Sequence, residues 1–132
     1  MRHAAIYGTS LVLVHLLVNI VHGFAHLKLH IELSPPAMLF VIGVIIVCPL
    51  VAASLLLWTS QQRLGLILLA LSMAASLHFG IYHHLVAMSP DFVGLQASSL
   101  WAVAFAITAY LLLLIEATGI YISVQPLYER SI

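Results

Sequence analysis

Histidine is the residue type in this sequence with the most chemistry to offer. The chain holds eight histidines in 132 residues, beside only four Lys or Arg and four Asp or Glu. Neutral imidazoles bind Zn, Cu, Fe and Ni ions, and two imidazoles can also hold a haem iron from opposite faces. A ring in an apolar environment stays neutral because burial disfavours its protonated form, and a metal ligand must be neutral. The histidines therefore raise the question of a metal or haem site.

Five polar residues follow one face of the first apolar stretch. They are spaced by four, three, four and four positions, and at about 100° per residue they fall within an arc of roughly 80° on a helix. Such a seam should face a bundle interior or a wet cavity rather than lipid. His22 and His26 form an HxxxH pair, which places two imidazoles on adjacent turns where they can bind one ion. The seam consists of His15, Asn19, His22, His26 and His30.

A second group of histidines lies near the end of the third apolar stretch. On a regular helix His83 continues a face of small residues that lets helices approach closely, and His84 lies on the flank of that face. His78 points to nearly the opposite side. The small residues of the face are Ser72, Ser76 and Gly80.

Depth in the membrane brings the two groups together. Both stretches run outward, and at 1.5 Å per residue His22 and His26 lie within about 8 Å of the outer end of the first one. His83 and His84 lie at the same level on the third. We therefore predict that His22 and His26 bind a metal ion or haem together with His83 or His84, with His78 as an alternative axial ligand.

The expected cofactor is a Zn, Cu or Fe ion, or haem b. A haem between two helices needs small residues beside its ligands, which Gly23 and Gly80 supply. Cys48 is the single cysteine, so a disulfide or a thiolate cluster within the chain is not expected, and we interpret it as an inert buried thiol. The expected role is redox chemistry, such as electron transfer, or metal handling.

Two acidic residues stand apart from these histidines in the sequence. Glu116 lies in an apolar run, and an intramembrane acid is a functional candidate by default. Its position, about 27 Å from the outer end of the fourth stretch, predicts an ion pair near the cytoplasmic face with Arg63, Arg2 or Tyr7, outside the histidine group. Asp91 lies in the outer loop and is expected as a turn residue. Alternatively, it caps a turn or accepts a bond from an imidazole N–H.

The composition identifies the elements that must position these residues. Hydrophobic residues make up 64% and charged residues 6% of the chain, and the mean hydropathy is +1.18. Soluble domains carry about 25% charged residues, and disorder needs low hydrophobicity. A net charge of zero also argues against nucleic acid as a partner. We predict an all-α bundle of four transmembrane helices in one domain, with short loops, over residues 4–27, 37–58, 64–86 and 98–123.

Local signals refine these helices. Ser98 or Ser99 can cap the start of the fourth helix. Pro49 falls inside the second helix and is expected to kink it. Gln125 and Pro126 are expected to end the fourth helix.

The few charges also predict the topology. Four spans place both termini and the second loop on one side, which then holds Arg2, Arg63 and Arg130, whereas the other side holds Lys28 alone. The positive-inside rule therefore predicts cytoplasmic termini in a multi-pass protein of a bacterial inner membrane. The expected partner is the lipid bilayer, with other membrane subunits or a second copy of the chain as further candidates.

Two other functions remain open from the sequence. The chain could be an accessory subunit of a larger membrane complex, with histidines that only bond neighbouring helices. It could also be a membrane enzyme that uses His and Glu116 as acid and base on a lipid-soluble substrate. The sequence does not assign catalytic residues.

Overall fold

The computed structural model describes residues 2–95 and 98–129, and the regular structure within them is entirely helical. Four helical spans are long and apolar enough to cross a membrane, which confirms the predicted all-α bundle. The second span runs unbroken through three elements, and the third through two. In chain order the elements are α1 (Arg2–Lys28), α2 (Pro35–Phe40), the π-helix η1 (Val41–Val47), α3 (Cys48–Trp58), α4 (Gln62–Ile81), the π-helix η2 (Tyr82–Val86), the 3-10 turn η3 (Val93–Leu95) and α5 (Leu100–Tyr128).

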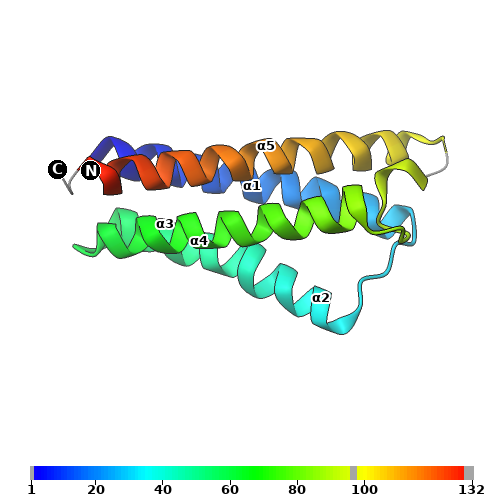
Figure 1. Cartoon of the computed structure of the whole chain (residues 1–132), viewed down its shortest axis with the longest axis horizontal. Coiled ribbons are helices and arrows are strands. Elements are labelled where there is room, and N and C mark those ends of the chain that lie inside the picture. Colours follow the sequence, from blue (N-terminus) through cyan, green and yellow to red (C-terminus); the bar gives the residue numbers. More distant parts are fainter. Residues whose placement is uncertain (1, 96–97, 130–132) are drawn as a thin grey trace.

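The helices lie side by side, and most of their packing is between α5 and its neighbours α1 and α4 (Figure 1). Helix α3 packs against α4 and α1 at the end where α1 begins. The start of α1 and the end of α5 lie at this same end of the bundle, as predicted. At the opposite end α2 diverges from the other helices, so the bundle is closed at one end and splayed at the other.

The closed end contains the main apolar core. Gly119 lets α5 approach α4 closely there, because a Cβ at this position would lie 2.9 Å from Cγ of Met73, which is fully buried. Tight packing of this kind fixes the helices without any polar contact. The buried core residues are Ala5, Val12, Ala52, Ala53, Leu56, Leu66, Leu69 and Met73.

The second span departs from α-helical geometry just before Pro49. Residues Val41–Val47 form a π-helix, and the backbone N–H of Cys48 donates to the carbonyl of Gly43, five residues earlier. Proline has no N–H and its ring crowds the preceding turn, so a wide turn at this point removes the conflict. The structure thus shows a π-helix directly before Pro49, whereas the kink stays a prediction.

Helix α5 begins as predicted but ends later. Ser99 caps it, since its Oγ accepts a hydrogen bond of 3.1 Å from the N–H of Ala102. The expected end at Gln125 and Pro126 is wrong, because the helix continues to Tyr128 and the N–H of Glu129 donates to the carbonyl of Gln125. A proline in the last turn costs only one hydrogen bond there. Arg130, used in the topology prediction, lies outside the described residues.

Candidate functional site

The turn that ends α1 orients the ring of His26. The N–H of Ile31 donates to the carbonyl of His26 and the N–H of His30 to that of Leu27, while His30 adopts a positive φ of 54°. This is a Schellman motif, which returns the chain over the last helical turn. The carbonyl of Ile31 consequently lies 3.4 Å from His26 Nδ1, which donates to it in the tautomer that carries its proton on Nδ1. His30 is exposed in the turn, so the prediction that it extends the seam of α1 is wrong.

His22, one helical turn before His26, is held from α5. Its Nδ1 lies 2.8 Å from Oγ1 of Thr108, and this hydroxyl donates its own proton to the carbonyl of Ala104 at 2.7 Å. The hydroxyl oxygen must therefore accept a proton from Nδ1 of the imidazole. The His22 ring also stacks on Phe105, which is fully buried, with the ring centroids 4.9 Å apart. Both contacts leave Nε2 of His22 as the nitrogen that can bind something else.

The π-helix η2 decides which histidine of the third span turns inward. His84 is buried and His83 only half-buried, so His84 takes the place that a regular helix would have given to His83. A π turn contains more residues than an α turn and so moves the inward position along the chain by about one residue. Nδ1 of His84 donates to the backbone carbonyl of Asp91 at 3.1 Å. Nε2 is then the ring nitrogen of His84 that remains for another partner.

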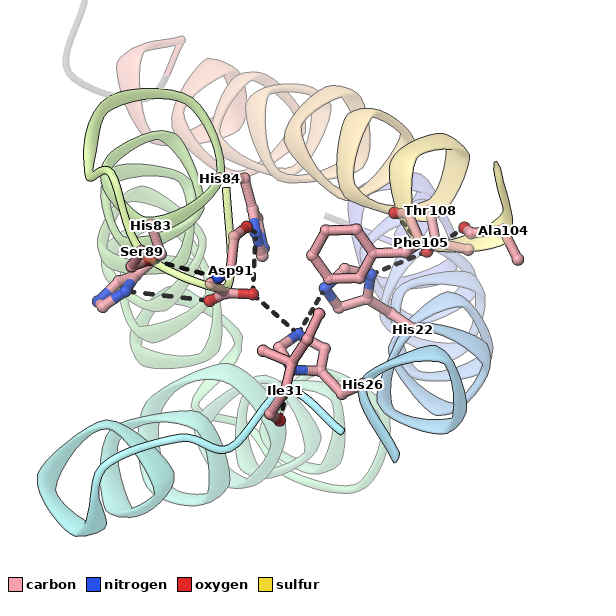
Figure 2. Close-up of polar contacts among 10 residues, drawn as sticks. All are labelled: His22, His26, Ile31, His83, His84, Ser89, Asp91, Ala104, Phe105 and Thr108. Atoms are coloured by element: carbon pink, nitrogen blue, oxygen red, sulfur yellow. Dashed lines mark hydrogen bonds and ion pairs between the residues drawn. The ribbon is translucent and has the colours of Figure 1, made fainter. Parts of the chain in front are cut away.

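Asp91 brings the two spans together. It was expected as a turn residue; it does lie in a turn, but its side chain is buried, with 4% of the residue exposed. Oδ1 lies 3.2 Å from Nε2 of His26 and 3.4 Å from Nδ1 of His84. Figure 2 shows the carboxylate pointing at His26 while His22 points at the same nitrogen. We call this group the outer cluster; its members are His22, His26, His84 and Asp91.

The outer cluster contains more acceptors than donors. Nδ1 of His22 donates to Thr108, so Nε2 of the neutral His22 ring can only accept a hydrogen bond. Nε2 of His26 lies 3.2 Å from this atom and 3.2 Å from Oδ1 of Asp91. A single proton on Nε2 of His26 can serve only one of these two acceptors. Neither carboxylate oxygen of Asp91 makes a hydrogen bond within the described part of the chain, although both are buried.

The remaining predicted ligands lie outside the outer cluster. His83 stacks on Phe79 with ring centroids 4.2 Å apart, and its Nδ1 reaches only to 3.9 Å from Oδ2 of Asp91. His78 is exposed on α4. The structure therefore brings together His22, His26 and His84 of the predicted histidines, and leaves His83 at the edge and His78 away from them.

The rings of the outer cluster stand too close together for a haem between them. Imidazole ligands in proteins typically bond through their second ring nitrogen to a carbonyl, carboxylate or hydroxyl, and Nδ1 of each of the three histidines lies within hydrogen-bond distance of such an oxygen here. A haem would have to enter between rings that touch, since His22 lies 4.8 Å from His26 and 5.0 Å from His84 between centroids. As the side chains stand, residues 2–95 and 98–129 contain no group of three or more His, Cys, Asp or Glu that could hold a metal. Binding would thus require small ring rotations.

A second buried polar group lies deeper in the bundle. Glu116 is 3% exposed, and its Oε1 lies 3.3 Å from Nε2 of His15. Nδ2 of Asn19 lies 3.1 Å from the same nitrogen. The predicted pairing of Glu116 with an arginine or tyrosine near the cytoplasmic face is therefore wrong. The reason is the register of α5, which extends to Tyr128 and so places Glu116 near the middle of the span.

One cavity connects the two polar groups. It has a volume of about 610 Å³ and lies between α1, α2, η1, α4 and α5 where the second span diverges. All four residues of the outer cluster line it, and so does Glu116, which we had expected to lie apart from the histidines. Its walls are otherwise mainly apolar. Several lining side chains, among them Ile20, Phe24 and Met38, are also exposed, so the cavity opens through the side of the bundle.

The histidines around Asp91 lower the pKa of its carboxyl group. Burial raises the pKa of Asp91, but the adjacent His84 ring and the positive charge that His84 and His26 can carry lower it more, so its pKa lies below the ordinary value of 3.8. Asp91 is thus an anion that faces imidazoles. Sequence reasoning undervalued it because turn residues are usually solvated; the available signal was a lone acid in a charge-poor loop close after a pair of histidines.

Comparison with known proteins does not identify the chain: neither a protein-family model, nor a curated protein, nor a solved structure matches it.

Proposed function

We propose that this chain is a membrane protein that binds a divalent transition metal ion in the outer cluster. His22 and His26 would supply Nε2, Asp91 would supply a carboxylate oxygen, and His84 would complete the set after a rotation of its ring. Imidazole and carboxylate ligands suit Zn²⁺, Fe²⁺ and Cu²⁺. Through its cavity, such a site would serve metal handling or redox chemistry at the membrane.

The observation that carries this proposal is the convergence of three potential ligand atoms. Nε2 of His26 lies 3.2 Å from Nε2 of His22 and 3.2 Å from Oδ1 of Asp91. Ligand atoms bound at about 2.0–2.2 Å to one Zn²⁺ in a tetrahedron stand at nearly this separation from each other. Nδ1 of His22 and Nδ1 of His26 lie within hydrogen-bond distance of an oxygen, which leaves the two Nε2 atoms for a bound ion.

We further propose that the outer cluster faces the extracytoplasmic side of a bacterial inner membrane. The opposite end contains Arg63 at the start of α4, whereas the end with the cluster contains Lys28 at the end of α1. The positive-inside rule then places the two termini in the cytoplasm.

The proposal is tested by metal analysis of protein purified in detergent, followed by titration of the chelator-treated protein with Co²⁺. Cobalt substitutes for zinc and iron, and imidazole coordination gives visible d–d absorption. The expected result is one Co²⁺ per chain in the unaltered protein and none in the double variant His22→Ala with His26→Ala.

His78→Ala is the matched control. It removes the same side chain from a membrane-spanning helix at an exposed position, and we expect it to bind Co²⁺ as the unaltered protein does. Far-UV circular dichroism checks that each variant is folded. Absence of d–d absorption in the folded unaltered protein, or its survival in the double variant, would refute the metal site and leave a proton as the cation shared by the cluster.

A further inference from the structure

Glu116 presents an acceptor to the cavity that no group of the described chain satisfies. Its Oε2 is buried and lacks a hydrogen-bond partner within residues 2–95 and 98–129. Leaving such an atom buried and unpaired is costly, so a partner from outside the chain is expected. A Cβ added at Gly80 would lie 3.8 Å from Oε2 but only 3.0 Å from Cδ2 of Leu113, so the absence of a side chain at Gly80 is what lets α4 pack this closely beside Glu116.

The partner that Oε2 needs is a hydrogen-bond donor without charge. Oε1 lies 3.3 Å from Nε2 of His15, so the imidazole serves one oxygen of the carboxyl group, and Oε2 has no partner in the described part of the chain. A charged group that entered the cavity would lose its hydration among apolar walls. A hydroxyl group meets the requirement at lower cost.

The cavity also has room for an apolar group attached to this hydroxyl. The volume of about 610 Å³ falls within the range of about 300–1,000 Å³ typical of small-molecule sites. Gly23 lines the cavity, and a Cβ there would meet nothing within 4 Å, so this wall is open. The exposed lining side chains, Phe24 and Met38 among them, border an opening between α1 and α2 at lipid depth.

We propose that the cavity binds a lipid-soluble alcohol or phenol, which enters from the bilayer between α1 and α2 and donates its hydroxyl proton to Oε2 of Glu116. The site is distinct from the outer cluster, although both line the same cavity. The inference does not depend on a bound metal.

The test compares three probes on the protein in detergent, with bound probe counted by native mass spectrometry. The probes are 4-nonylphenol, 1-dodecanol and nonylbenzene, of which the last has no hydroxyl. We expect at least one hydroxyl probe to bind about tenfold more tightly than nonylbenzene, as one buried hydrogen bond provides. A preference for the phenol or for the alcohol then tells which of the two the site takes.

Two kinds of variant locate the probe. Glu116→Leu should abolish the preference for hydroxyl probes and leave nonylbenzene binding unchanged. Gly23→Leu should weaken all probes by filling the cavity, whereas Gly43→Leu should not, since Gly43 also faces open space but does not line the cavity. The Gly23 variant keeps the test valid if Glu116→Leu does not fold.

The double variant His22→Ala with His26→Ala separates this inference from the metal site. We expect it to lose Co²⁺ while keeping the preference for hydroxyl probes. Equal binding of all probes by the unaltered protein, or equal weakening by both glycine variants, would overturn the inference whatever the metal analysis shows.

Discussion

Thr108 accepts a hydrogen bond from Nδ1 of His22 at 2.8 Å while it donates to the backbone of its own helix. This contact joins α5 to α1 at the depth of the outer cluster. It also fixes which nitrogen of His22 carries the proton, because the single proton of the hydroxyl is already used. One side chain thus sets both the position and the tautomer of a proposed ligand.

Thr108→Val should weaken metal binding about 10- to 100-fold, the usual effect of removing a group that orients a ligand. The valine keeps the shape of the side chain but cannot accept the proton of His22. Isothermal titration with Zn²⁺ after chelator treatment measures the change. Thr108→Ser retains the hydroxyl and should bind nearly as tightly as the unaltered protein; an equal loss in both variants would contradict the role of the hydroxyl.

Asp91 should make the metal-free protein less stable in acid. Its pKa is lower in the folded state than its ordinary value of 3.8. The carboxylate therefore contributes stability that is present above pH 3.8 and is lost as the pH falls through the lower folded pKa. Thermal unfolding followed by circular dichroism between pH 6 and pH 3, with chelator present, records this loss as a falling Tm.

Asp91→Asn provides the comparison for the acid series. The amide does not titrate, so the Tm of this variant should be lower at pH 6 and should depend less on pH below 4. Parallel pH curves for the two proteins would show that the acid sensitivity comes from another group.

Two glycines should respond in opposite ways to an added methyl group. Gly119→Ala places a Cβ 2.9 Å from Cγ of Met73 and 3.1 Å from Cδ2 of Leu11, so we expect a loss of about 1–3 kcal/mol in stability. Gly23→Ala meets nothing within 4 Å and should fold at least as stably as the unaltered protein. Thermal unfolding in one detergent compares the two; equal Tm values would contradict the close packing of α5 against α4.

The topology can be tested by labelling in intact cells. In a Cys48→Ser background, Ser89→Cys should react with a membrane-impermeant maleimide applied outside, and Ser60→Cys should react only after permeabilisation. Ser89 and Ser60 lie in loops at opposite ends of the bundle. The reverse pattern would place the outer cluster on the cytoplasmic side.

The fold could be predicted from the sequence because a single physical property dominates it. Stretches of more than twenty apolar residues must form helices in lipid, and the serine cap at Ser99 and the wide turn before Pro49 follow from local chemistry. The end of α5 was missed because proline weakens a last turn without breaking it.

The site was only partly predictable, and the reasons are specific. His22 and His26 follow from helical periodicity alone. The inward placement of His84 depends on a π turn, and no residue pattern in Tyr82–Val86 predicts one. The burial of Asp91 depends on how the loop folds back over η2, and the partner of Glu116 depends on the register between two helices far apart in the sequence.

The wide turn at η2 has a consequence for how this protein tolerates change. If the turn tightened to α-helical geometry without loss of a residue, the inward position would pass from His84 to His83. Both are histidines, so an imidazole would still face Asp91. The adjacent pair therefore keeps a ring nitrogen opposite the carboxylate in either geometry of the third span.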